Sequence, residues 1–114
     1  MMKFVALYRT PADPAAFDDA YFTTHLPLLA SAPGLQRTEV GRVKRMMAGE
    51  PAYYLVAEMY FADSDALKAA LKSSEWAESG KNLASFGGME LATMFTVEVL
   101  EPAADTQSST LNTS

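Results

Sequence analysis

Two stretches of the chain are extended and apolar on both faces, a pattern that few small folds can satisfy. In residues 3–9 one face carries Phe4, Ala6 and Tyr8, and the positions between them are apolar as well. Residues 52–61 repeat the pattern with aromatic and branched side chains. Successive side chains of a strand point to opposite faces, so both strands have to be covered on both sides. The sequence therefore predicts a sheet with a layer of structure on each face.

A long helix is predicted between these two strands, over residues 14–31. Asp13 suits its N-cap, because a carboxylate there accepts hydrogen bonds from the first free backbone N–H groups. Pro27 removes one backbone hydrogen bond and is expected to interrupt the helix. Pro33 and Gly34 then end it.

The remaining elements follow from polarity and capping signals. Residues 35–47 are extended but mostly polar, as in an edge strand that is protected from mispairing. Asp63 caps a second helix, and a further helical piece covers residues 74–85. Residues 89–100 are predicted to form the last strand.

The element order is therefore β-α-β-β-α-β, the ferredoxin-like arrangement of the α+β class with a four-stranded antiparallel sheet. In this topology the first and third strands are central, which agrees with the doubly apolar pattern. Two helices cover only one face of such a sheet. The other face needs a second sheet, and a second copy of the chain supplies one. We expect a homodimer whose sheets pack face to face, a dimeric α/β barrel.

Length and composition indicate one domain followed by a tail. The chain has 114 residues, enough for a single domain, which we assign to residues 1–101. Residues 102–114 are polar and nearly free of bulky apolar side chains, so we expect a disordered tail.

Residue counts exclude several kinds of site. The absence of cysteine removes disulfides, thiolate nucleophiles and cysteine-based metal sites, and a single histidine excludes a multi-histidine metal site. A formal net charge of −5 argues against nucleic acid and anionic membranes as partners. No stretch resembles a targeting segment or a membrane span, so cytoplasmic placement is the expectation.

His25 is the first candidate for chemistry. Helical spacing places Phe17, Tyr21, His25 and then Leu28 or Leu29 along the buried stripe of the predicted helix. An imidazole at such a position exchanges protons near neutral pH. The alternative is a structural histidine that bonds to a backbone carbonyl or to Tyr21.

Glu58 is the second candidate, because a carboxylate between apolar neighbours on a central strand needs a partner or a wet cavity. Three cations across the sheet are available for an ion pair: Arg9, Arg42 and Lys44. Tyrosine hydroxyls beside apolar surface are typical of small-molecule pockets. The expected pocket-lining residues are Tyr8, Phe17, Leu28, Glu58 and Tyr60.

Two stretches of the chain resemble the EthD family. Residues 17–28 hold a tyrosine before a His-x-Pro-Leu run, and a Pro-Gly-Leu turn follows at residues 33–35. The second stretch comprises the segments AEMYF, DAL and LKSSEW at residues 57–61, 65–67 and 71–76. Both occur in the family's order and together span nearly the whole domain.

The resemblance implies a dimeric α/β barrel. Founding members of the family accompany a cytochrome P450 system that degrades an alkyl ether. Relatives of similar fold include polyketide cyclases, decarboxylases, muconolactone isomerases and quinol-forming monooxygenases, which act on small apolar or aromatic molecules without metal. His25 falls on the family's characteristic histidine and Tyr21 on its preceding tyrosine. Cysteine-assisted mechanisms do not carry over, because this chain has no cysteine.

The leading hypothesis is a cofactor-independent lyase, isomerase or cyclase for a small hydrophobic or aromatic molecule. His25 would move a proton as acid or base, and Tyr21 would orient the imidazole or bond the substrate oxygen. The alternative is a non-catalytic accessory or carrier protein, with an oxygenase of the same pathway as partner. Haem binding through His25 is a third, weaker interpretation, since nothing else marks an iron pocket.

Overall fold

The computed structural model describes residues 1–101. Expectations for the tail, residues 102–114, lie outside the described residues. Within the described part, no helix is long and apolar enough to cross a membrane.

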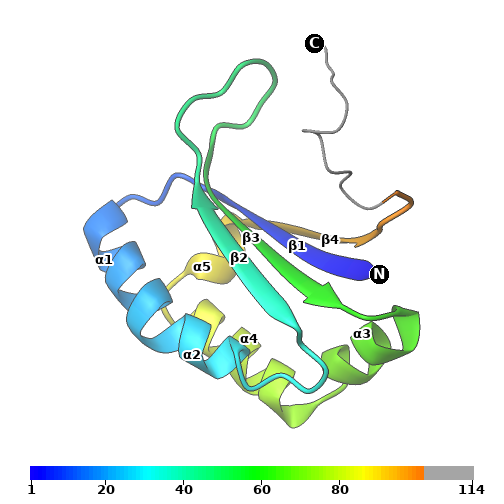
Figure 1. Ribbon diagram of the computed structural model, residues 1–114. Helices are drawn as coiled ribbons and strands as arrows, with labels where there is room; N and C mark the ends of the chain where they lie inside the picture. The colour runs from blue at the N-terminus through cyan, green and yellow to red at the C-terminus, as the bar shows by residue number, and fades with distance from the viewer. Residues whose placement is uncertain (102–114) are drawn as a thin grey trace.

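A four-stranded antiparallel sheet forms one layer, and all helices lie on one of its faces (Figure 1). The strand order is β2-β3-β1-β4. The strands are β1 (Met2–Arg9), β2 (Arg37–Arg42), β3 (Tyr53–Phe61) and β4 (Ala92–Glu98). The predicted α+β, ferredoxin-like fold is confirmed, with the two doubly apolar strands at the centre.

The core lies between the sheet and the helices. The register pairs Ala6 of β1 with Ala57 of β3 on one side and with Met94 of β4 on the other, so all three side chains share the helix-covered face. Strand β3 contributes four buried residues to this face, at the positions Leu55, Ala57, Met59 and Phe61. Alternation along the strands thus builds the floor on which the helices pack.

The first helical region has three parts: α1 (Pro14–Ala20), the π-helical turn η1 (Tyr21–His25) and α2 (Leu26–Leu29). Asp13 is its N-cap as expected, accepting from the Ala16 N–H at 3.2 Å. The prediction of an interruption at Pro27 is wrong. The irregularity lies one turn earlier, where the Leu26 N–H bonds to the Tyr21 carbonyl five residues back. Pro27 stands near the start of α2, where a missing N–H is tolerated.

The second helical region comprises α3 (Ser64–Leu71), α4 (Ser74–Ser85) and α5 (Gly88–Leu91). Asp63 caps α3 by accepting from the Ala66 N–H at 2.8 Å. The expected strand from residue 89 starts later, because Gly87 at φ 81° leads into α5 and the strand begins at Ala92.

Tyr54 departs from the alternation expected for its strand. Tyr8 pairs with Leu55 and Arg9 pairs with Tyr53, so the ladder slips at this point. The Tyr54 ring consequently packs on Phe17 of α1 at 6.1 Å between ring centroids, on the helix side of the sheet.

The other sheet face has no helix over it in the described chain (Figure 1). Register places Val5, Leu7, Val56 and Phe95 on this open face. Phe95 is 43% exposed, although Val5 is only 6% exposed among its neighbours. One apolar face of the sheet therefore remains accessible in the single chain.

Candidate functional site

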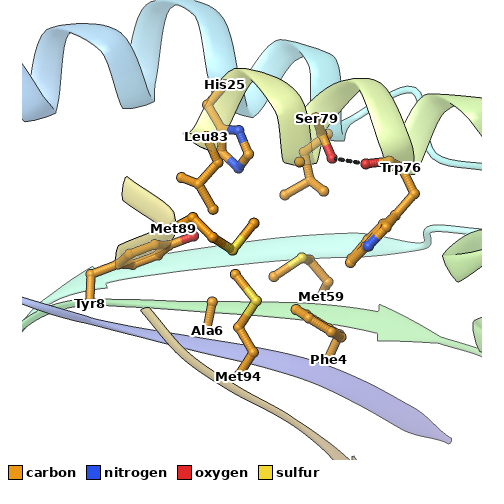
Figure 2. Close-up of a pocket in the computed structure, with 12 residues that line it drawn as sticks. Phe4, Ala6, Tyr8, His25, Met59, Trp76, Ser79, Leu83, Met89 and Met94 are labelled. Atoms are coloured by element: carbon orange, nitrogen blue, oxygen red, sulfur yellow. Dashed lines mark hydrogen bonds between the residues drawn. The ribbon is translucent and has the colours of Figure 1, made fainter. Parts of the chain in front are cut away.

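A small cavity of about 50 Å³ lies between the sheet and the helices (Figure 2). Its floor includes Tyr8 of β1 and Met59 of β3, and Met94 of β4 lies beside them. Its roof is formed by His25 of η1 and by Leu83 of α4. This volume is well below the roughly 300–1,000 Å³ of typical small-molecule sites, so a ligand of that size requires the lining side chains to move apart.

His25 is the polar centre of this apolar cavity. It is 4% exposed, and its ring lies 5.1 Å from that of Tyr21 and 6.4 Å from that of Phe86, between centroids. Burial lowers the pKa of His25, and contacts with the Asn82 side chain and the Ser79 backbone only oppose this shift. The imidazole is therefore neutral at neutral pH, and its Nδ1 atom has no hydrogen-bond partner.

Two tyrosines next to His25 are held in the protonated form. Burial raises the pKa of Tyr8 to about 12, opposed by its contact with Tyr21. Burial also raises the pKa of Tyr21, and the neighbouring Tyr8 phenol adds to that rise. The two rings meet edge to face at 5.3 Å. At neutral pH both phenols keep their protons, so a ligand in the cavity meets a hydroxyl at Tyr8 and not a phenolate.

The structure sorts the candidates on the first helix into two groups. His25 faces the cavity, whereas Tyr21 is fully buried behind it and stacks on Phe17 at 5.5 Å. Neither Phe17 nor Leu28 lines the cavity; Leu29, four residues after His25, does. A residue four positions on lies on the same helix face, which is why Leu29 takes the place expected for Leu28.

The expected cavity positions of Glu58 and Tyr60 are corrected, because both side chains lie on the open face of the sheet. Glu58 Oε1 accepts from Lys3 Nζ at 2.8 Å, so its ion pair forms with a cation that the sequence analysis had not named. The Tyr60 ring lies between Lys3 and Arg37, at 5.6 and 4.6 Å from its centroid. Successive side chains of β3 point to opposite faces of the sheet, and the helices cover the face that does not carry Glu58 and Tyr60.

Sequence reasoning also missed the contribution of α4. Trp76, Ser79 and Leu83 of this helix line the cavity, at the spacing of one helix face. The Ser79 hydroxyl donates to the Trp76 carbonyl at 2.8 Å (Figure 2), so it is already occupied within the helix. The helical spacing of these three residues is visible in the sequence. It does not show that this face of α4 packs next to His25.

The ligand sets that usually hold metal ions in proteins consist of acidic, histidine and cysteine side chains. Within residues 1–101, no group of three or more such side chains is placed to hold a metal ion. The cavity-lining residues include the imidazole of His25 and the phenol of Tyr8, which exchange or donate protons.

Two relatives share a substantial part of their sequence with this chain. An uncharacterised 11.0 kDa protein from the thcB–thcC intergenic region of Rhodococcus erythropolis is 31% identical over 98 residues, or 86% of this chain and 95% of that protein. The crystal structure of an ethyl tert-butyl ether d (EthD) family protein from Bacillus halodurans is 40% identical, with a TM-score of 0.79. The match covers 86% of this chain and 97% of that one.

More distant structures share the fold. A dimeric ferredoxin-like protein of unknown function from Jannaschia is 20% identical with a TM-score of 0.63, covering 87% of this chain and 100% of that one. SnoaB of Streptomyces nogalater, described as a cofactor-independent oxygenase, is 22% identical with a TM-score of 0.55. The match covers 84% of this chain and 87% of that one.

The sequence model of the EthD domain matches residues 9–86, which include η1, α4 and the central strand β3 of the cavity floor. This match extends over more than half of the chain, and the Rhodococcus relative agrees with it over 86%. The chain belongs to the EthD family.

Proposed function

We propose that the protein binds a small hydrophobic or aromatic molecule in the cavity beneath His25 and transfers a proton of that molecule without a cofactor. The reaction class is that of a lyase, isomerase or cyclase. One observation carries the proposal: a neutral imidazole, 4% exposed, is the roof of a cavity whose other walls are mostly apolar.

The surroundings of His25 favour a base. A neutral imidazole accepts a proton directly, and the lowered pKa keeps it ready to do so at neutral pH. The Tyr8 hydroxyl, protonated at this pH, is available to donate to a carbonyl oxygen on which negative charge develops. Tyr21 supports the imidazole through its ring contact at 5.1 Å. Such acid–base help contributes about 10²–10⁴-fold, enough for an activated proton next to a carbonyl.

The likeness to SnoaB supports chemistry without a cofactor as a use of this fold. At 22% identity it supports no particular reaction for this chain.

A carrier or accessory protein is the second candidate function. Three methionines, Met59, Met89 and Met94, line the cavity, and their flexible thioethers adapt to ligands of different shape (Figure 2). Among the described cavity residues only His25 has an ordinary pKa near neutrality, so the cavity lacks a second group that exchanges protons there. A carrier for another enzyme of the pathway, such as an oxygenase, needs only the adaptable apolar walls.

We also infer that a second copy of the chain covers the open face of the sheet. The exposed Phe95 and its apolar neighbours on this face support the inference, as does the dimeric state of the Jannaschia protein. Face-to-face packing would also enclose the half-buried ion pair between Lys3 and Glu58.

One comparison separates the enzyme from the carrier. His25→Ala and the wild type are titrated with a panel of aromatic ketones and lactones, and both binding and turnover are followed. Catalysis predicts unchanged binding and a kcat at least about 100-fold lower in the variant. Thr24→Ala is the matched control, because Thr24 is exposed in the same π-helical turn. Binding without turnover by any of the three proteins favours the carrier, and a wild type that binds none of the panel contradicts both functions.

A further inference from the structure

Three buried side-chain atoms around the imidazole have no hydrogen-bond partner. They are Tyr21 Oη, His25 Nδ1 and Asn82 Oδ1, and they are the only such atoms in residues 1–101. Leaving a buried polar atom unpaired costs about 1–3 kcal/mol. Two of the three belong to η1 and one to α4, two elements that pack against each other.

Asn82 and His25 are complementary in kind. A carboxamide oxygen only accepts hydrogen bonds, whereas an imidazole nitrogen donates when it carries the proton. The Asn82 side chain and the Ser79 backbone, both on α4, each favour the protonated form of His25 and so oppose the lowering of its pKa by burial. A proton on Nδ1 offers a donor to the unpaired Asn82 Oδ1, whereas a proton on Nε2 leaves both Nδ1 and Oδ1 as acceptors without a donor. Only the first arrangement satisfies both unpaired atoms at once.

The placement of Asn82 agrees with this pairing. It stands on α4 between Ser79 and Leu83, both of which line the cavity, and it is itself half-buried. Figure 2 shows the imidazole directed from the helices toward the cavity. Because Nδ1 is buried and unpaired, Nε2 is the ring nitrogen left for a ligand to meet.

We propose that Asn82 is a positioning residue that holds His25 in the Nδ1–H tautomer, leaving the Nε2 lone pair directed into the cavity. The catalytic meaning of this arrangement rests on the proposed function. The tautomer itself does not, because it is a property of the protein without ligand.

The single histidine makes the tautomer directly measurable. In ¹⁵N-labelled protein, long-range ¹H–¹⁵N correlation spectra contain one imidazole, and its two nitrogen shifts show which atom carries the proton. We expect protonated Nδ1 and unprotonated Nε2 in the wild type above the pKa of His25. A spectrum with Nε2 protonated, or with both tautomers equally populated, overturns the proposal without the need for any variant.

Variants test the role of Asn82 itself. Asn82→Leu removes the acceptor at similar volume, and the ratio of Nδ1–H to Nε2–H should fall about tenfold, as for one ordinary hydrogen bond. Asn82→Asp adds a charge and should raise the pKa of His25. Lys81→Ala is the control, because Lys81 is exposed on the same helix. An unchanged tautomer ratio in folded Asn82→Leu contradicts the proposal.

Turnover keeps this inference separate from the proposed function. If the protein is an enzyme, Asn82→Leu should lower kcat more than it changes KM, and Asn82→Asp should shift the acidic limb of the pH profile upward. If the wild type shows the Nδ1–H tautomer but no turnover on the panel, the positioning stands and the enzymatic function fails. If the wild type shows turnover but carries the proton on Nε2, the enzymatic function stands and the positioning role of Asn82 fails.

Discussion

At the scale of single residues, the candidate site depends on which groups carry protons. Burial lowers the pKa of His25 and raises that of Tyr8 to about 12, so the cavity holds a neutral base next to a neutral donor. The histidine was identifiable from sequence, because it is the chain's single imidazole and lies on an apolar helical stripe. Asn82 was not, because an asparagine on a polar helix gives no signal until its neighbour across the interface is known.

The lowered pKa of His25 predicts a loss of stability in acid. Its pKa is below 6.5 in the folded chain and near 6.5 in the unfolded one, so the unfolded state binds more protons between these values. The free energy of unfolding should therefore fall as pH decreases from about 6.5 through the folded pKa, and the full contribution is present above this window. Urea midpoints measured from about pH 7.5 to 5 check this.

His25→Gln is the comparison for the pH prediction, since it keeps a polar side chain that does not titrate. Carboxylates contribute equally to both proteins, so the difference between the two curves isolates the histidine. Parallel curves would show that the folded and unfolded pKa values of His25 are the same.

At the scale of elements, the site forms where the π-helical turn η1 meets α4 over the sheet. The wider turn of a π-helix changes how the side chains before His25, from Tyr21 onward, are placed relative to the cavity face. Polar contacts also hold the first helical region to the sheet. Arg42 of the edge strand β2 donates two hydrogen bonds to the Asp18 carboxylate of α1, at 3.2 and 3.1 Å. The Tyr54 hydroxyl of β3 donates to the same carboxylate. The capping residues Asp13 and Asp63 correctly predicted where two helices start. The position of Pro27 alone did not predict the π-helical turn η1.

Two glycines near α4 are expected to respond oppositely to alanine. A Cβ at Gly80 meets nothing within 4 Å, so Gly80→Ala should stabilise the helix by about 0.5–1 kcal/mol. A Cβ at Gly88 lies 2.5 Å from Leu83 Cδ1 and 3.2 Å from the Leu83 carbonyl oxygen. Because Leu83 is buried, Gly88→Ala should destabilise the protein by about 1–3 kcal/mol. Chemical denaturation measures the free energy of unfolding of both variants. Equal denaturation midpoints for the two would contradict this packing.

At the scale of the whole molecule, one sheet face is covered by helices and the other is open in the single chain (Figure 1). The apolar side chains on both faces of the central strands forecast this division. They did not say which face the helices cover, and for that reason Glu58 and Tyr60 were expected in the cavity. The structure places both on the open face.

A charge on the open face should separate the proposed dimer. Phe95 is 43% exposed in the single chain, so Phe95→Glu leaves the protomer folded but sets carboxylates into a face-to-face interface. Sedimentation at micromolar concentration should show a dimer for the wild type and a monomer for the variant. Leu71→Glu, at a residue 37% exposed on α3, is the control that should remain dimeric. A monomeric wild type would contradict the dimer itself.

The sequence alone determined the order of the elements, the central position of β1 and β3, and the place of His25 on an apolar helix face. These features follow from alternation, helical spacing and capping, which are local properties of the chain. Only the tertiary structure decided which sheet face lies under the helices, that Lys3 pairs with Glu58, and that α4 meets the imidazole. Such contacts join residues far apart in the sequence, and their geometry is set by how whole elements pack.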